Sequence, residues 1–302
     1  MIYDCFPFFD ENDLLELRIN QHWNYFDKFI VVEAGETHTG LKKDFNFDHD
    51  RFKKYSSKIV YRKFDNFQEE ISKSPELLDG HSVRDRTAHG QHTPDWIRDH
   101  FQGNYSVKVL KDIGIKDDDI VYLSSIDEIL NKKGFNEGLS YFDNNDLFSL
   151  KAGPNEIYDN NGNQIFMRPS LGFSLDLYVY KFNLFCKKMA VAQMTEFSVL
   201  KKVLPSTIRS LSFGTHPAIK DAGWHFTYLD NSNGAKVLKK QKSWAHSRDS
   251  IPGQKMKFQV SSVEEALDRM FKDYETKKVS MTRDSHPKYL IDNLDVYKDY
   301  IF

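Results

Sequence analysis

The alternation of apolar strands with a helix near the start most constrains the fold of this chain. Residues 2–9, 29–33 and 59–61 are short apolar segments of the kind that forms strands. Between the first two, apolar residues recur at helical spacing, which predicts a helix that has Asp10 as its N-cap and ends near Phe26. This β-α-β order predicts an α/β fold with a mostly parallel central sheet.

The rest of the chain predicts a more mixed arrangement. We expect a long irregular loop over residues 65–94 and a helix over residues 95–113. Later elements are expected as strands at 146–150 and 165–167 around an Asn161-Gly162 turn, strands at 173–184 and 223–229, a helix ending near Ser243 and a helix over 263–274.

Composition excludes several classes of protein. The 302 residues are 40% hydrophobic and 28% charged, with a net charge of −2, which is typical of a globular protein without a nucleic-acid footprint. The two cysteines, Cys5 and Cys186, are expected as buried thiols in a reducing compartment. The sequence has no basic segment followed by an apolar one at its start and no apolar run of about 20 residues, so we expect neither signal peptide nor transmembrane segment and a cytoplasmic location.

The acidic segment of residues 117–129 is the first candidate for a functional site. It reads as a turn, a buried strand over residues 120–123, and then Asp127 and Glu128. Ligands of open α/β sheets bind beyond the carboxyl ends of strands, and carboxylates there suit Mg²⁺ or Mn²⁺ holding a diphosphate. If the two carboxylates alternate along a strand, one alone reaches the ion and Glu128 is salt-bridged or supports the site. The alternative to a metal site is that the strand simply ends in a solvated acidic loop.

Other candidate residues follow from their places on expected strands. Glu33 and Thr37 follow the second strand, where a nucleotide base or ribose would bind; otherwise they cap a loop. His225 alternates with Trp224, so one of them faces the core and the other the opposite side of the sheet. The histidines between residues 81 and 100 match no standard zinc spacing.

Six segments, in the same order along the chain, resemble glycosyltransferase family 17, whose animal members add the bisecting N-acetylglucosamine to N-glycans. The segments are residues 2–18, residues 31–40, the helix with Trp96, Asp99, Gln102 and Asn104, the acidic segment 118–129, Ala222-Gly223-Trp224-His225-Phe226-Thr227-Tyr228, and Lys242-Ser243-Trp244-Ala245-His246. The resemblance implies a GT-A fold in one domain over residues 1–302. Its Rossmann-like nucleotide-sugar-binding half is residues 1–130, and residues 131–302 form the acceptor half and C-terminal helices.

The resemblance also implies a reaction and a set of site residues. The reaction is inverting transfer of a sugar, most often N-acetylglucosamine, from a UDP-sugar to a glycan acceptor, with Mn²⁺ or Mg²⁺ as cofactor. The implied residues are Glu33, Thr37, His38, Gln102, Ser125 and Asp127 for the nucleotide sugar, Asp127, Glu128, His225 and His246 for the metal, and Trp224 and Tyr228 for the acceptor. An inverting transfer also needs a general base. Asp221, Glu196 and Asp176 are the candidates, and the sequence does not choose among them.

Two positions depart from the family pattern. Ser125 stands where the family has the first Asp of its Asp-x-Asp-Glu motif, and Gly103 stands where it usually has Arg. A hydroxyl is a weaker metal ligand than a carboxylate, and loss of an Arg removes a charge-assisted clamp on a diphosphate. These departures motivate a second hypothesis, a degenerate module that binds a nucleotide sugar or glycan without turnover. A metal-dependent hydrolase is a third. The missing anchor suggests a microbial enzyme, or a viral one in the host cytoplasm.

Overall fold

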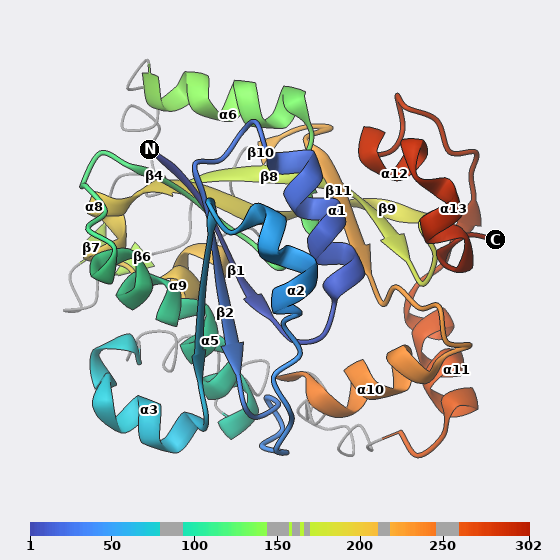
Figure 1. Ribbon diagram of the computed structural model, residues 1–302, viewed down its shortest axis with the longest axis horizontal. Helices are drawn as coiled ribbons and strands as arrows, with labels where there is room; N and C mark the ends of the chain where they lie inside the picture. The colour runs from blue at the N-terminus through green and yellow to red at the C-terminus, as the bar shows by residue number, and fades with distance from the viewer. Residues whose placement is uncertain (79–92, 144–156, 159–163, 166–169, 211–217, 246–259) are drawn as a thin grey trace.

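The computed structural model describes residues 1–78, 93–143, 157–158, 164–165, 170–210, 218–245 and 260–302 (Figure 1). Its main feature is one curled, open sheet of ten strands with the path β3-β2-β1-β4-β9-β8-β11-β5, with β10 paired to β8 and β12 to β9. The chain is therefore of the α/β class, as the sequence predicts.

The strands are β1 (Ile2–Phe8), β2 (Lys28–Ala34), β3 (Ile59–Phe64), β4 (Ile120–Leu123), β5 (Glu128–Leu130), β6 (Ile157–Tyr158), β7 (Gln164–Ile165), β8 (Leu171–Val179), β9 (Leu184–Glu196), β10 (Ala218–Ile219), β11 (Gly223–Thr227) and β12 (Lys277–Lys278). The α-helices are α1 (Asn12–His22), α2 (His49–Phe52), α3 (Phe67–Lys73), α5 (Pro94–Asp112), α6 (Lys132–Asp143), α8 (Phe197–Leu200), α9 (Pro205–Ser210), α10 (Ala235–Ser243), α11 (Val263–Asp273), α12 (Lys288–Asp292) and α13 (Leu294–Tyr297). Short 3-10 turns are η1 (Lys53–Tyr55), η2 (Pro75–Leu77) and η5 (Lys298–Tyr300).

Strand direction divides the sheet into a parallel and a mixed part. β1 pairs in parallel with both β2 and β4, and β2 with β3. β9 then pairs antiparallel with both β4 and β8, while β8 and β11 are parallel to each other. Two reversals restore the direction, so β1, β4, β8 and β11 all run the same way and their carboxyl ends lie at one edge.

Helices cover both faces of the parallel strands because the strands alternate apolar side chains between two cores. Phe6 and Phe8 of β1 pack with α1 in one core, which also contains Phe29 and Val31 of β2. Tyr3 and Cys5 of the same strand pack in the other core with residues of α5. Because apolar side chains of β1 face both cores, this alternation marks a strand buried on both sides.

Several boundaries differ from those that the sequence predicts. The N-cap of α1 is Glu11, not Asp10, because the Glu11 carboxylate turns back to accept hydrogen bonds from the backbone N–H groups of Phe9 (3.1 Å) and Asp10 (3.0 Å). The expected loop over 65–94 contains α3, whose N-cap Asn66 accepts a hydrogen bond from the Glu69 N–H at 2.8 Å. Residues 79–92 lie outside the described part.

The predicted strand over 173–184 is wrong at its end. Strand β8 stops at Val179, and Tyr180 adopts a left-handed backbone with φ of 73°, which turns the chain into β9. The expected strand at 165–167 is the two-residue β7, which pairs with β6. The proposed strand at 146–150 and the Asn161-Gly162 turn lie outside the described residues.

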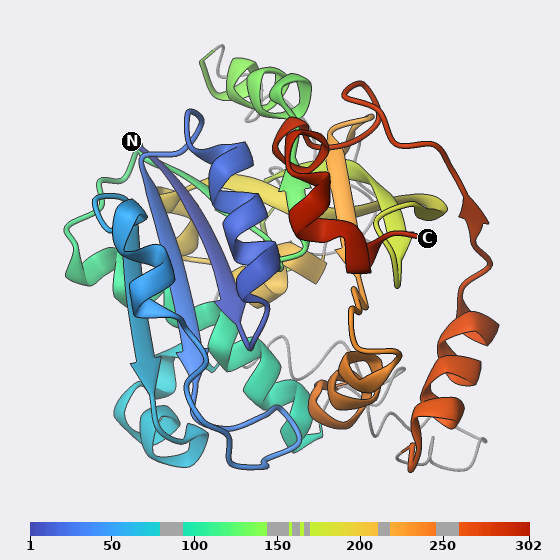
Figure 2. The ribbon, with the colours of Figure 1, turned by 45° about the vertical axis from the view of Figure 1, so that its right-hand side comes forward.

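Helix α10 lies beyond the carboxyl ends of β1 and β11 (Figures 1 and 2). No helix among the described residues is long and apolar enough to cross a membrane. The carboxyl edge of the sheet, with α10 facing it, is where the candidate residues of the acidic segment lie.

Candidate functional site

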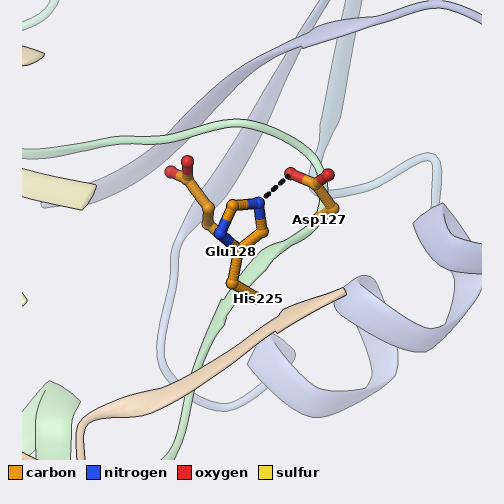
Figure 3. Close-up of side chains that lie close together, drawn as sticks. All are labelled: Asp127, Glu128 and His225. Carbon is orange, nitrogen blue, oxygen red and sulfur yellow. Dashed lines mark ion pairs between the residues drawn. The ribbon is translucent and has the colours of Figure 1, made fainter. Parts of the chain in front are cut away.

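Two carboxylates and a histidine form a cluster near the carboxyl ends of β4 and β11. One ligand atom from each of Asp127, Glu128 and His225 lies within 4.8 Å of the others. Figure 3 shows the imidazole of His225 between the carboxylates of Asp127 and Glu128. Because Asp127 precedes β5 instead of lying on it, strand alternation does not separate the two carboxylates, and both contribute an oxygen to the cluster.

The pairing of β11 with β5 brings His225 to this cluster. The two strands are antiparallel, and His225 lies directly opposite Glu128. Gly223 permits the close approach, since its φ is +153° and a Cβ there would lie 2.0 Å from the carbonyl oxygen of Ile129. A side chain at position 223 would therefore push the two strands apart.

Asp127 is a buried carboxylate with unused bonding capacity. Its Oδ2 lies 3.3 Å from Lys240 Nζ, and its Oδ1 lies 3.5 Å from His225 Nε2. Burial acts to raise the pKa of Asp127, but the positive charge of Lys240 and the interaction with His225 outweigh it and hold the pKa well below its usual range. Within the described residues, Asp127 Oδ1 and His225 Nδ1 are buried without a hydrogen-bond partner.

Glu128 forms a bidentate ion pair with Arg209. Both terminal nitrogens of Arg209 donate to its carboxylate oxygens at 3.0 Å, and the backbone N–H of Ser125 donates to Oε2 at 2.9 Å. Arg209 also donates to the Ser125 hydroxyl at 3.0 Å. Glu128 is thus salt-bridged, and Ser125, at the position of the family's first aspartate, contacts the same arginine.

A buried arginine holds the loop that carries Asp127. Arg18 is fully buried and donates to both carboxylate oxygens of Asp4, at 2.9 and 2.5 Å. One of its nitrogens also donates to the carbonyl oxygens of Ser125, Ile126 and Glu128, at 2.8, 3.0 and 2.9 Å. His22 completes the network, because its Nδ1 pairs with Asp4 at 2.8 Å and its Nε2 accepts from the Leu130 N–H at 2.8 Å.

Of the residues expected to bind the nucleotide sugar, Ser125 and Asp127 lie in the acidic segment described above, and the other four lie around the loop after β2. Glu33 is fully buried and its carboxylate binds Lys43, Tyr61 and two backbone N–H groups of the 46–47 segment, so it orders its own loop. His38 and Gln102 come together, with 2.9 Å between His38 Nε2 and Gln102 Oε1. The Thr37 hydroxyl pairs with that of Thr39 at 2.9 Å.

The three candidate general bases lie away from the Asp127 cluster. Asp176 is paired with Trp224 across β8 and β11, and so it shares the Trp224 face of the sheet, opposite to that of His225. Glu196 is paired with Ile120, at the start of β4. Asp221 precedes β11 and is ion-paired with Lys188. The structure therefore brings none of the three beside Asp127.

The expected acceptor residues also have different surroundings. Trp224 is in the core, where its indole N–H donates to the Ser285 carbonyl at 2.7 Å. Tyr228 follows β11 and lines a pocket beside Asp127. His246, expected as a metal ligand, lies outside the described residues.

This pocket contains residues that the sequence did not indicate. Besides Asp127 and Tyr228 it is lined by Glu11, from the loop after β1, and by Lys236, Lys239 and Lys240 of α10. Burial, together with the nearby Asp10 charge, raises the pKa of Glu11. A carboxylate next to the first strand's carboxyl end was a usable signal for Glu11. No local pattern marked Lys240 or Arg209.

Fold and site together define an α/β protein with a carboxylate–histidine cluster at the carboxyl edge of its sheet. Residues 1–137 match the model of Glycosyltransferase family 17. This match confirms the resemblance seen in the sequence and indicates a glycosyltransferase. It covers Asp127 and Glu128, and it ends before His225. No curated protein matches the chain.

Proposed function

We propose that the protein is an inverting glycosyltransferase with a GT-A type fold that moves a sugar, N-acetylglucosamine by family resemblance, from a UDP-sugar to a glycan acceptor. The observation that carries the proposal is the cluster of Asp127, Glu128 and His225 within the edge of the sheet where α/β proteins bind ligands. The family match over residues 1–137 supports the class of reaction.

The donor set suits a divalent ion such as Mn²⁺ or Mg²⁺. Two ligand atoms of one ion, with bonds of about 2.0–2.2 Å, lie roughly 3–3.5 Å apart. Asp127 Oδ1 and His225 Nε2 are 3.5 Å apart, and this oxygen accepts no hydrogen bond from the described residues. We therefore propose Asp127 and His225 as the ligands of the ion. Glu128 stays in its ion pair with Arg209 and is not a ligand. When bound, the ion would offset charge on the leaving diphosphate.

The side chains around the cluster supply the remaining functions. Arg209 and Lys240 place two positive charges next to the carboxylates, where a diphosphate needs them. Glu11 is the carboxylate with a raised pKa in the pocket that Asp127 lines, so we propose it as general base in place of Asp176, Glu196 and Asp221. Tyr228 gives the pocket an aromatic wall for a sugar ring.

The test is release of UDP from a panel of UDP-sugars, with Mn²⁺ and a mixture of glycan acceptors. We expect acceptor-dependent release from at least one donor by the wild type. Asp127→Asn should lower it by about 10²-fold or more, as loss of a metal ligand implies, and Glu11→Gln should lower kcat with little change in KM. The matched control is Asp118→Asn, which alters an exposed carboxylate of the same acidic segment. Turnover that survives Asp127→Asn would contradict the proposal.

The second candidate function is a binding module without turnover. The contact between the Ser125 hydroxyl and Arg209, at 3.0 Å, favours it, because an aspartate at this position would instead offer the ion another carboxylate. At Gly103, in the interior of α5, a Cβ would meet no described atom from outside the surrounding helical turns, so packing at this point does not require glycine. An inert wild type that binds UDP, together with activity in Ser125→Asp, would establish this alternative.

A further inference from the structure

Lys240 is directed at the one carboxylate on which the proposed metal site depends. Its Nζ lies 3.3 Å from Asp127 Oδ2 and 3.2 Å from the hydroxyl of Thr227, which ends β11. The ammonium also lies 5.2 Å from the centre of the Tyr228 ring. The side chain reaches this place from α10, on the far side of the pocket from the sheet.

The neighbouring lysines of α10 have other partners. Lys236 donates to the hydroxyl of Tyr300 at 2.7 Å, and Lys239 is ion-paired with Asp10. All three lysines line the same pocket, yet Lys240 alone among them contacts Asp127. An amine paired with a carboxylate carries its positive charge at neutral pH, so Lys240 is an ammonium group beside Asp127.

A charged amine on Asp127 and a divalent cation on Asp127 compete. The ammonium neutralises the carboxylate in the free protein, and a second cation on the other oxygen would be repelled by it. A nucleotide diphosphate removes this conflict, because its oxygens can accept hydrogen bonds from the ammonium and place negative charge between the two cations. The competition is therefore relieved when the donor arrives.

We propose that Lys240 is a ligand of the donor diphosphate that occupies Asp127 while the donor is absent and transfers to the phosphate oxygens when the nucleotide and the cation bind. This inference rests on the proposed function and deepens it, because it makes cation binding weak without the nucleotide and strong with it. No bond is made or broken in this exchange; one ion pair replaces another.

The experiment compares Lys240→Met with the wild type in two titrations. Mn²⁺ alone is titrated by electron paramagnetic resonance, and UDP is titrated by calorimetry with Mn²⁺ present. We expect Lys240→Met to bind Mn²⁺ alone more tightly, and to bind UDP about 10- to 100-fold more weakly, as the loss of a charge-assisted hydrogen bond implies. Opposite signs in the two titrations are the mark of an exchanging lysine; a merely structural lysine would weaken both.

Further variants make the result decisive. Lys272→Met removes an exposed lysine of helix α11 that does not line the pocket, and it should change neither titration. Lys240→Arg keeps the charge and should restore most of the UDP affinity. Lys240→Gln, which also removes the charge, serves in place of the methionine variant if that one does not fold. Unchanged UDP affinity in Lys240→Met, or weaker binding of Mn²⁺ alone, would overturn the inference while leaving the proposed function standing. A wild type that binds no UDP would overturn both.

Discussion

Arg18 fixes the position of Asp127 without touching it. Its guanidinium is fully buried and joins Asp4 to the carbonyl oxygens of the loop between β4 and β5. In the sequence, Arg18 stands in an amphipathic helix among apolar residues, where an arginine ordinarily reaches solvent. Residue type and position mark Asp127 as a candidate, but nothing local marks Arg18, because its hydrogen bonds to the loop around Asp127 join segments more than a hundred residues apart.

Replacing Arg18 with methionine should destabilise the protein strongly. The change leaves the Asp4 carboxylate buried without its ionic partner, which typically costs 3–5 kcal/mol. The free energy of unfolding, from urea denaturation, measures this. Arg51→Met is the matched control, because Arg51 pairs with Asp13 and Glu16 at a partly exposed site and should cost about 1 kcal/mol. Equal losses in the two variants would contradict the structural role of Arg18.

Ser125 and Glu128 show the limit of prediction from residue types. The sequence correctly places both beside Asp127, and it leaves open whether Glu128 binds a metal or an arginine. The structure assigns Glu128 to Arg209, which belongs to the short helix α9. That helix has no sequence pattern connecting it to the acidic segment, so the pairing depends on tertiary packing.

At the scale of elements, the sequence is most informative where a strand contains several consecutive apolar residues. β1, β2 and β3 and the helices α5, α10 and α11 lie close to their predicted places. β9 was missed because Lys187 and Lys188 interrupt it, and β5 because three residues carry no periodicity. α1 ends earlier than predicted, at His22, although apolar residues continue at helical spacing to Phe26.

The cluster forms because β5 pairs with β11, which places His225 opposite Glu128. Gly223→Ala should disturb this pairing, because a Cβ would lie 2.0 Å from the Ile129 carbonyl oxygen and 2.8 Å from the Leu130 Cα. We expect a lower melting temperature and Mn²⁺ affinity reduced about tenfold in the presence of UDP, since a ligand misplaced by roughly 1 Å binds poorly. The measurements are thermal denaturation and calorimetry.

Gly114→Ala is the control for this variant. Gly114 also has a positive φ, of +77°, but no described atom lies within 4 Å of the place of its Cβ. It should lower stability through backbone strain alone and leave Mn²⁺ affinity as in the wild type. Metal affinity lost equally in both variants would show that the contact between Gly223 and Ile129 has no special importance.

At the scale of the whole molecule, one sheet joins the two halves of the sequence. β4, in the part matched by the family, pairs with β9, and β5 pairs with β11. The α/β class was predictable because local patterns of period 2 and 3.6 determine it. The order of strands beyond β4 was not, because pairings such as β9 with β4 join segments far apart in the chain.

The stability of the folded chain should fall as the pH falls from 7 to 5. Burial lowers the pKa of His22, although the Asp4 carboxylate partly offsets it, and burial lowers that of His286. A histidine whose pKa is depressed by folding binds its proton more readily in the unfolded chain, so its contribution to stability is present above about pH 6.5 and is lost below it. The raised pKa of Glu11 acts in the opposite direction.

Comparison of variants isolates the effect of His22. Melting temperatures measured by calorimetry between pH 7.5 and pH 5 should decline less steeply in His22→Gln than in the wild type. His49→Gln, at an exposed position, should reproduce the wild-type slope. A His22→Gln profile parallel to that of the wild type would mean that His22 does not titrate in this range.

We propose that Asp127 and His225 hold a divalent ion beside a nucleotide diphosphate at the carboxyl edge of the sheet. Anomalous diffraction at the manganese edge, from crystals soaked with UDP and Mn²⁺, would locate this ion. We expect a manganese peak within ligand distance of Asp127 Oδ1 and His225, in contact with the diphosphate. UDP bound with no such peak at Asp127, or manganese bound elsewhere, would contradict it.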